Sequence, residues 1–597
     1  MPTSSDSSID EMRVHRLSLA NIALIFIIAV VAQIVVDKTF AFAFLPRSSS
    51  SSPQRLVAVP TSLLASRAST GGFKRKNFRP NELVEQIETC RTGRRLSEII
   101  RGNSNIFHST DTIKAIVQKV AELKPTMQIR ELTGLLNALS KVWVPQAARE
   151  VHTKLMSVLS ELASHKLEGC EPRDISMMLN AMAKRNIRNE IVLAEAAEVS
   201  IQIVDTFNAQ DITNTLNAFA RLNYYHAELF DKVAKSSISL IATFNEQNLA
   251  NIVNAFARVQ RSHPALLNAI AGATIPILDT FTSQGLANVV NGFAKLNHRH
   301  DELFEEIAKT AISIMDEFKP QELANTANAY ARMSHSHPML FEAMAESAIP
   351  IIDSFKPQEL AITVNAFARL EHSHPLLFDK VAETAVPIMD TFNAQGMSNM
   401  VNAYAKQYHH HPKLFDTVAS ASIPIIDTFT AQGLANTVNA FAKMECRNVE
   451  LFETAANASI TIIDTFNSQH LSNTVNAFAK MNHRHTVLFE EVANAAIPIS
   501  STFNSQEVAN TLHAYGKMNH PHPTLFEALA NAAIPILDSF DSRELASMLN
   551  AYAKSNYEHK ALFEALKSAG IPTVCGSKDA EAKRGTHQTS LSSAYVA

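Results

Sequence analysis

Apolar and polar residues follow each other along most of this chain with the period of an α-helix. In the stretch 431–443, AQGLANTVNAFAK, steps of about 100° per residue bring Leu434, Val438 and Phe441 to one side of a helix. Alanines flank that side, where small side chains let neighbouring helices approach closely. The opposite side carries a narrow polar stripe, made of Gln432, Asn436, Asn439 and Lys443. We expect the stripe to face outward from a row of such helices.

This stretch is one copy of a repeat that returns every 37 residues. Its glutamine stands at a constant step, as Gln210, Gln247, Gln284, Gln321, Gln358, Gln395, Gln432, Gln469 and Gln506. Arg173 and Arg543 continue the step at either end. RELTGLLNALSK, from Arg130, is an earlier copy if the linker near Lys166 is a few residues longer. About twelve repeats therefore cover residues 130–571.

Each repeat is predicted to hold two helices. Helix A, for example 208–222, opens with Asn, Thr or Asp at the position of a helix cap, and Pro320 and Pro357 fall at the first helical position of two copies. A polar break leads to helix B, for example 376–392, which ends on a phenylalanine. A proline such as Pro387 stands late in most B segments, where it should kink or restart the helix.

The fold class follows from this pairing. Glycine is scarce and alanine, leucine and phenylalanine are abundant, a composition that favours helices. Two helices cannot bury their apolar faces alone, whereas stacked pairs share a continuous core. We therefore predict an all-α protein, a right-handed α-solenoid of about twelve helix pairs.

The first eighty residues have the composition of a targeting sequence. Residues 17–36 carry no charge and are preceded by Arg13 and Arg16, and AFAFLP at 41–46 offers a small-x-small cleavage pattern with Phe44 after the cut. The residues from Phe44 to Pro80 are rich in Ser and Arg and lack Asp and Glu. The predicted organisation is a signal peptide (1–43), a transit-peptide-like stretch (44–81), an N-terminal helical cap (82–129), the solenoid (130–571) and a polar tail (572–597). An uncleaved membrane anchor is the alternative for the apolar run.

Stacking the repeats turns the polar stripe into two rows. The basic ladder consists of Lys141, Lys184, Arg221, Arg258, Lys295, Arg332, Arg369, Lys406, Lys443, Lys480, Lys517 and Lys554. The amide ladder consists of Asn137, Asn180, Asn217, Asn254, Asn291, Asn328, Asn365, Asn402, Asn439, Asn476 and Asn550, and His513 interrupts it once. Exposed positions of helix B vary freely from copy to copy, whereas the ladders do not. A partner with regularly spaced negative charge and hydrogen-bonding edges would match both ladders.

Structural roles are the alternatives for the ladders. Each asparagine could hydrogen-bond to the neighbouring repeat, and each lysine or arginine could cap the carbonyls at the end of helix A. Charge outside the ladders does not favour nucleic acid, because residues 82–597 hold 43 Lys/Arg against 53 Asp/Glu, a net charge near −10. Any attraction of a polyanion must therefore be local.

No enzymatic site is recognisable in the sequence. The recurring histidines that precede helix B, such as His298/His300 and His372/His374, raise the possibility of a metal site, but no Cys or carboxylate recurs beside them, and loop packing or helix capping is the other interpretation. The four cysteines lie far apart without a CxxC pair. We expect no catalytic activity, no cofactor and no metal.

The repeats resemble the octotricopeptide and heptatricopeptide repeat proteins of organelles, whose helix pairs carry motifs of the form LANxxxAFAKL. They are also similar to the helical regions of FAST-kinase-like proteins and of RNA-editing substrate-binding complex subunits. The leader resembles the bipartite plastid presequence of algae with complex plastids, whose junction is often ASAFAP. No RAP-like domain follows the repeats, so nuclease activity is not carried over.

The resemblance implies an organellar single-stranded RNA-binding protein that acts in transcript processing, stability or translation. The RNA-contacting residues would be the members of both ladders from Lys184 to Lys554. We expect a monomer, located in the plastid, that cooperates with other RNA-processing proteins and has no stable membrane association after loss of its leader. The alternative function is a protein-interaction scaffold, and the alternative locations are the mitochondrion or an anchor in the endomembrane system.

Overall fold

The computed structural model describes residues 80–569, and this part of the chain is all-α, with helices joined by short turns and no strand. The all-α solenoid prediction is confirmed. The described residues form two compact units. Unit 1 runs to Phe281 and includes Lys295–His300, and unit 2 comprises Thr282–Ala294 and the residues from Asp301 onward. The predicted signal peptide, nearly all of the transit-peptide-like stretch and the polar tail lie outside the described residues.

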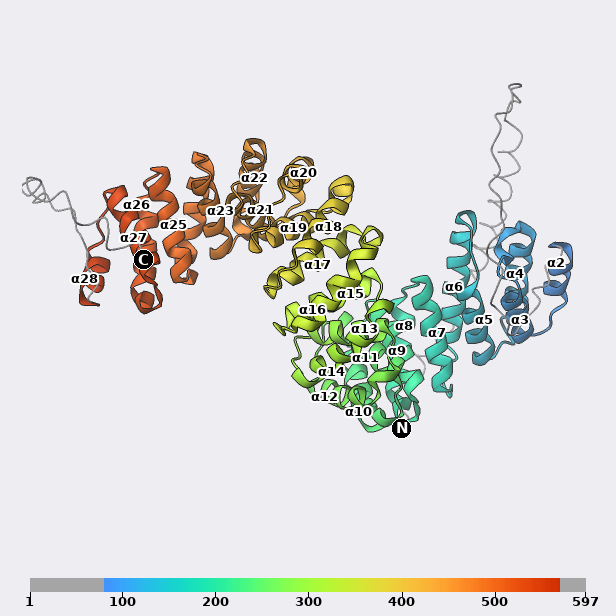
Figure 1. Cartoon of the computed structure of the whole chain (residues 1–597). Helices are drawn as coiled ribbons and strands as arrows, with labels where there is room; N and C mark the ends of the chain where they lie inside the picture. Colours follow the sequence, from blue (N-terminus) through green and yellow to red (C-terminus); the bar gives the residue numbers. More distant parts are fainter. Residues whose placement is uncertain (1–79, 570–597) are drawn as a thin grey trace, which may run out of the picture. The chain divides into compact units, whose positions relative to one another are not determined.

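The α-helices alternate between A and B positions along the chain (Figure 1). Those of unit 1 are α2 (Pro80–Thr89), α3 (Gly93–Gly102), α4 (Thr110–Leu123), α5 (Ile129–Lys141), α6 (Arg149–Ser164), α7 (Pro172–Arg185), α8 (Glu190–Ile203), α9 (Ala209–Arg221), α10 (Ala227–Leu240), α11 (Glu246–Arg258) and α12 (Pro264–Thr274). Those that follow are α13 (Ser283–Lys295), α14 (Asp301–Ser313), α15 (Pro320–Arg332), α16 (Pro338–Ala348), α17 (Pro357–Arg369), α18 (Pro375–Ala385), α19 (Ala394–Lys406), α20 (Pro412–Ser422), α21 (Ala431–Lys443), α22 (Val449–Thr461), α23 (Ser468–Lys480), α24 (Thr486–Ala496), α25 (Ser505–Met518), α26 (Pro523–Ala533), α27 (Ser542–Ser555) and α28 (Lys560–Ser568).

Short 3₁₀ helices connect many of these elements. They are η1 (Ile106–His108), η2 (Gln146–Ala148), η3 (Val204–Thr206), η4 (Ile241–Thr243), η5 (Ile275–Thr280), η6 (Met315–Glu317), η7 (Ile349–Ser354), η8 (Val386–Thr391), η9 (Ile423–Thr428), η10 (Ile463–Thr465), η11 (Ile497–Thr502) and η12 (Ile534–Ser539). From η3 onward, each one joins a B helix to the A helix of the next repeat.

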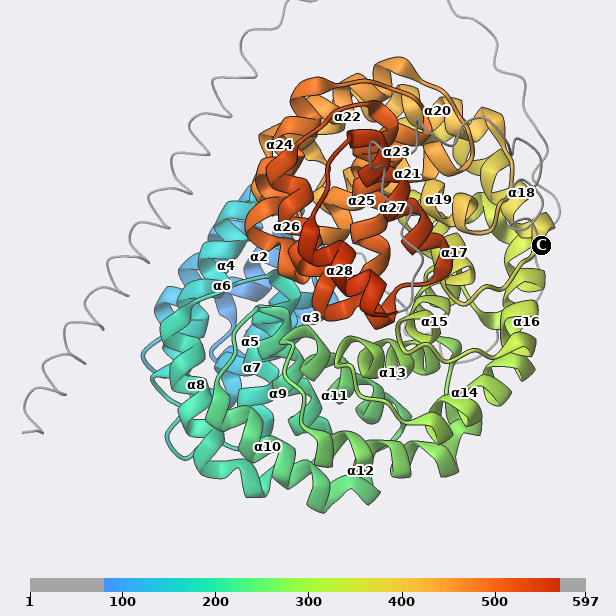
Figure 2. The ribbon, with the colours of Figure 1, turned by 90° about the vertical axis from the view of Figure 1, so that its left-hand side faces the viewer.

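Within each unit the helices form two layers, which can be followed in Figure 2. In unit 1 the A layer packs α5 against α7, α7 against α9 and α9 against α11, and the B layer packs α6, α8, α10 and α12 in the same order. In unit 2 the A layer runs from α15 to α27 by the same neighbour-to-neighbour contacts. The solenoid core lies between the layers.

Aromatic pairs join the two layers in most repeats. Phe367 of α17 meets Phe341 of α16 edge-on, with ring centroids 4.8 Å apart. Some repeats have tyrosine in place of the phenylalanine of helix A. The hydroxyl of the buried Tyr330 then donates a hydrogen bond to the carbonyl oxygen of Phe304, at 2.6 Å, and Tyr404, Tyr515 and Tyr552 do the same with the corresponding phenylalanine. The buried hydroxyls are thus satisfied.

Helix A begins and ends with local signals. The Asn208 side chain caps α9 by accepting from the Asp211 N–H at 2.9 Å, and Pro320 is the first residue of α15. After each A helix from α7 onward one residue adopts a left-handed conformation, with φ between 46° and 60°: Asn186, Asn223, Gln260, Asn297, Ser334, Glu371, Tyr408, Glu445, Asn482, Asn519 and Asn556. Asparagine is common there because it tolerates this conformation better than most residues.

Helix B ends earlier than its apolar pattern suggests. The predicted segment 376–392 consists of α18, which ends at Ala385, and the 3₁₀ helix η8, with Pro387 at its start. The proline therefore restarts the chain as a 3₁₀ helix, because it cannot donate to the preceding turn. In α22, where Thr461 replaces the proline, the α-helix spans 13 residues instead of the 11 of α20.

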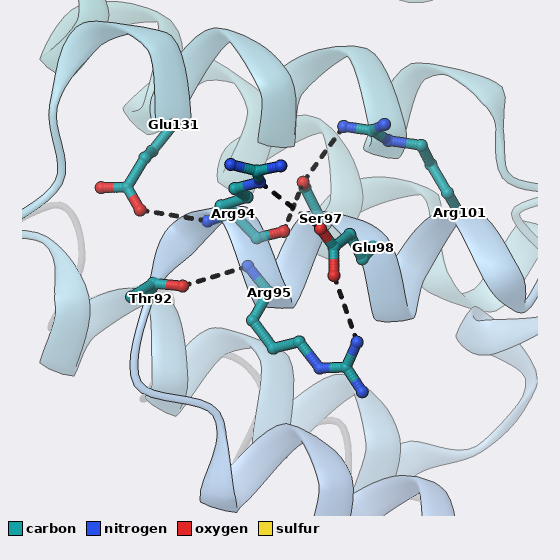
Figure 3. Close-up of polar contacts among 7 residues, drawn as sticks. All are labelled: Thr92, Arg94, Arg95, Ser97, Glu98, Arg101 and Glu131. Carbon is teal, nitrogen blue, oxygen red and sulfur yellow. Dashed lines mark hydrogen bonds and ion pairs between the residues drawn. The ribbon is translucent and has the colours of Figure 1, made fainter.

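The predicted helical cap contains a helix pair of its own. Thr92 caps α3 by accepting from the Arg95 N–H at 3.2 Å (Figure 3). Glu131, in the first turn of α5, accepts from the Arg94 N–H at 3.2 Å and so ties α5 to α3 (Figure 3). Because α3 packs against α5 as α5 packs against α7, the A layer of unit 1 begins at α3.

Candidate nucleic-acid interface

Helix A is exposed along one stripe only, and this stripe is the polar one. In α21, Gln432 is exposed, Asn436, Asn439 and Lys443 are half-buried, and the other nine residues are buried. The neighbouring A helices α19 and α23 pack along α21, and Phe441 meets Phe415 of α20 edge-on, with ring centroids 5.0 Å apart. The polar stripe is thus the surface that remains open to a partner.

The amide ladder has hydrogen-bonding capacity that the protein does not use. Its members from Asn217 to Asn476 are half-buried and Asn550 is exposed. Across residues 80–569, the structure contains no hydrogen bond from a side-chain amide of this ladder to another protein group, although the more N-terminal Asn214 does accept one from Gln210. The structure therefore does not support the alternative in which each asparagine bonds to the neighbouring repeat. The members of the amide ladder from Asn217 onward are Asn217, Asn254, Asn291, Asn328, Asn365, Asn402, Asn439, Asn476 and Asn550.

The basic ladder has no protein counter-ion along most of its length. Lys295 aside, its members make no ion pair and no side-chain hydrogen bond within the described part of the chain, and all are exposed except the half-buried Lys443. This set is Lys141, Lys184, Arg221, Arg258, Arg332, Arg369, Lys406, Lys443, Lys480, Lys517 and Lys554. The carbonyls at the end of helix A are satisfied by backbone N–H groups instead, as in Tyr224 to Phe219 at 3.0 Å. The capping alternative is therefore not supported either.

Neighbouring positive charges act on one another along the ladder. Partial burial lowers the pKa of Lys184, and the charges of Lys141 and Arg221 lower it further. At the interruption of the amide ladder, burial lowers the pKa of His513 and the charges of Lys517 and Lys554 add to this effect. Mutual repulsion without a protein counter-ion favours the binding of an anion along the row.

Contacts between neighbouring A helices use other polar residues, which the sequence analysis did not single out. The Ser176 hydroxyl donates to Asp211 at 2.9 Å, Thr133 donates to Asp174 at 3.2 Å, and the Asn248 amide donates to the Thr213 hydroxyl at 3.1 Å. These groups are buried in the first half of helix A. The one sequence signal that could have identified these contacts is a polar residue at a helix position that is otherwise apolar.

Opposite charges gather at the two ends of helix A. The basic ladder lies at its C-terminal end, whereas the 3₁₀ helix that precedes its N-terminal end carries an exposed aspartate in most repeats: Asp205, Asp279, Asp316, Asp353, Asp390, Asp427, Asp464 and Asp538. This arrangement also complements the helix dipole. A polyanion is therefore attracted to one end of helix A and repelled from the other.

The recurring histidines that stand directly before helix B are helix caps, whereas the histidine two residues earlier makes other contacts, as His372 does by stacking on Phe341. His374 precedes α18, and its Nδ1 accepts from the Leu377 N–H at 3.1 Å, while its Nε2 lies 3.6 Å from a carboxylate oxygen of Glu342. The same cap is formed by His226, His263, His337, His411, His485, His522 and His559. Residues 80–569 contain no cluster of three or more His, Cys, Asp or Glu suited to a metal ion, and no helix among them is long and apolar enough to span a bilayer.

The fold and this surface define an α-solenoid whose exposed A-layer stripe carries a repeated amide and a repeated positive charge. A family model described as RNA-editing substrate-binding complex 8 protein matches residues 267–569, just over half of the chain. A second one, described as RNA-editing substrate-binding complex 6 protein, matches residues 90–309. The chain belongs to the family of RNA-editing substrate-binding complex proteins.

Solved structures share only the helical-repeat architecture. Importin13 in its cytosolic state is 8% identical with a TM-score of 0.31, covering 83% of this chain and 85% of that one. A homology model of the full-length AP-3 complex is 12% identical with a TM-score of 0.30, covering 83% and 93%. The C-terminal fragment of the Chaetomium thermophilum cohesin loader SCC2 is 12% identical with a TM-score of 0.27, covering 82% and 46%. Such low scores carry no argument about function, and no curated protein matches the chain.

Proposed function

We propose that this protein binds single-stranded RNA along the exposed stripe of its A helices and holds it for an RNA-editing or transcript-maturation assembly whose catalytic subunits are other proteins. The observation that carries the proposal is the pair of ladders: within residues 80–569 the ladder amides make no side-chain hydrogen bond to another protein group, and the basic residues other than Lys295 have no protein counter-ion. Membership of a family named for the binding of RNA-editing substrates supports the same conclusion.

The two ladders suit two parts of a nucleotide. Lysine and arginine attract phosphate oxygens. Phosphates recur at regular intervals along RNA, and the basic residues of the ladder recur at regular intervals along the solenoid. A side-chain amide has both a donor and an acceptor, and so can pair with base edges or with ribose hydroxyls. The near-identity of successive repeats favours a grip on the backbone over assignment of a different base to each repeat.

A ladder variant tests the proposal. If about eight basic residues each neutralise one phosphate, the logarithm of affinity should fall against the logarithm of salt concentration with a slope near −6, from roughly −0.7 per contact on single strands. Replacing Arg332, Arg369, Lys406 and Lys443 with Gln should roughly halve that slope. Fluorescence anisotropy with a labelled oligouridine measures both quantities.

A matched variant controls for net charge. Changing Lys232, Lys235, Lys309 and Lys356 to Gln removes the same formal charge at exposed positions outside the ladder. This variant should keep a slope near that of the wild type, and circular dichroism should show both variants folded. If the folded ladder variant binds with unchanged affinity and slope, the ladder does not bind RNA, and the protein-scaffold alternative takes its place.

A further inference from the structure

Three aromatic side chains are exposed beside the basic ladder. Trp143, Tyr225 and Tyr408 are 53%, 41% and 66% exposed, and they are the exposed tryptophan and tyrosine residues of the described part of the chain. Each lies within four residues of the C-terminal end of an A helix: α5 ends at Lys141, α9 at Arg221 and α19 at Lys406. All three rings therefore stand at the basic end of the A layer, although the aromatic residues of the core lie between the layers.

In each of the three cases, a basic or histidine side chain lies against the ring. Trp143 is stacked on His108, with ring centroids 4.4 Å apart. The Arg261 guanidinium carbon lies 5.0 Å from the ring centre of Tyr225, and the Lys443 ammonium lies 4.0 Å from that of Tyr408. A cation or a stacked ring holds an aromatic side chain in one orientation. The exposed remainder of each ring is thus a fixed surface.

Tyr408 is the clearest of these surfaces. It occupies the left-handed position that follows helix A, with φ of 51°, where six of the eleven repeats have asparagine. Tyrosine is a costlier choice than asparagine at this φ, and most of its side chain is exposed here rather than buried. It lies two residues after the exposed Lys406 of its own repeat and against Lys443 of the next one.

We infer that Tyr408 is a base-stacking platform, on which one nucleobase of the bound strand lies while Lys406 and Lys443 meet the flanking phosphates. The inference rests on the proposed RNA binding and adds a contact with a base at a defined repeat. Stacking on an aromatic ring tolerates any base, and it is the usual way in which single-stranded nucleic acid is held beside a basic groove. Trp143 and Tyr225 provide equivalent surfaces in unit 1.

The test compares Tyr408→Asn with Tyr408→Phe in the full chain. Asparagine is the residue most repeats have at this position, so the first variant should fold; the second keeps the ring. With a labelled oligoadenylate, Tyr408→Asn should weaken binding by roughly 5- to 150-fold and Tyr408→Phe by less than about twofold. The salt slope should stay unchanged in both variants, because no charge is lost. Ser334→Asn, at the same register two repeats earlier, is the control and should bind like the wild type.

An abasic oligonucleotide of equal length separates stacking from other effects. It keeps the phosphates but offers no base, so the wild type and Tyr408→Asn should bind it equally. A weaker binding of Tyr408→Asn to the abasic strand as well would mean that the ring only positions Lys443, and would overturn the stacking role. If Tyr408→Asn binds oligoadenylate like the wild type while the four-residue ladder variant is impaired, stacking is refuted and the proposed function stands. If the wild type binds neither oligonucleotide, both fail.

Discussion

Acidification should weaken unit 1 through one buried histidine. The ring of His152 is buried in α6, its Nε2 lies 3.0 Å from the carbonyl oxygen of Leu139, and it meets Phe107 edge-on at 5.0 Å. Burial lowers its pKa from 6.5 to about 4, the hydrogen bond to Leu139 opposes this shift, and the charge of Arg185 adds to it. A pKa of about 4 leaves the folded His152 uncharged at neutral pH, and its Nε2 carries the hydrogen because a carbonyl oxygen can only accept.

The sign and size of the effect follow from linkage. Between pH 6.5 and pH 4 the unfolded chain binds a proton at this residue and the folded chain does not. The contribution of the neutral His152 to the free energy of unfolding is therefore fully present above pH 6.5 and is lost as the pH falls toward 4. At 1.36 kcal/mol per pKa unit, the difference in pKa corresponds to about 3 kcal/mol of unfolding free energy. About 2 kcal/mol of this is lost between pH 7 and pH 5.

Trp143 gives a direct assay, because it is the one tryptophan of the chain and it lies in the turn between α5 and α6. Urea unfolding followed by its fluorescence at pH 7 and pH 5 gives the free energy of unfolding of this region. His152→Gln keeps an N–H donor for Leu139 and cannot titrate, so its pH-dependent loss should be smaller by about 2 kcal/mol. His165→Gln, at the exposed C-cap position of α6, should leave the loss unchanged. An equal loss in the wild type and His152→Gln would refute the reasoning.

Two further predictions concern a helix cap and the leader. His374→Ala should cost about 1 kcal/mol of unfolding free energy and speed exchange of the Leu377 amide, whereas His374→Asn should not, because Asn448 naturally caps α22 at the same register, at 2.9 Å from the Leu451 nitrogen; equal exchange in both variants would contradict the cap. We also propose that the leader directs import into a complex plastid. A fluorescent protein fused to residues 1–80 should reach that plastid and be diverted by Phe44→Ala, and its retention in the endomembrane system would contradict this.

Helix A could be predicted closely because its signals are local. The segment 208–222 corresponds to α9, Ala209–Arg221, with Asn208 as its cap. The cap, the apolar side and the polar stripe all depend on the spacing of residues within one helix, which sequence displays directly. The end of helix B could not be predicted as well. The same apolar pattern continues through α18 and η8, and the change from α to 3₁₀ geometry depends on a missing N–H group and on packing.

The state of the ladders could not be decided from sequence. An asparagine at the angle of Asn439 suits a hydrogen bond to the next helix as well as it suits solvent, and the spacing of the A helices decides between them. Close packing is maintained instead by buried pairs such as Ser176 with Asp211, whose positions in different repeats become neighbours only in the folded solenoid. The capping role of the histidines was easier to predict from sequence, because it depends only on a histidine standing directly before helix B.

Because the ladders are uniform, they do not by themselves fix the register of an RNA strand along the solenoid. In the proposed mode of binding, the exposed aromatic residues supply the difference between repeats. A strand held only by identical lysine and asparagine contacts could slide by one repeat and regain nearly every contact, because the surface would look the same after each step. Fixing an RNA segment in place therefore requires repeats that differ from the rest at the binding edge. Trp143, Tyr225 and Tyr408 are such differences. Tyr408 lies against Lys443 of the ladder, whereas Trp143 is stacked on His108 and Tyr225 lies against Arg261, both of which are outside the ladder. On this reasoning the ladders set how strongly RNA is held, and the rings set at which repeats a base of any identity is stacked.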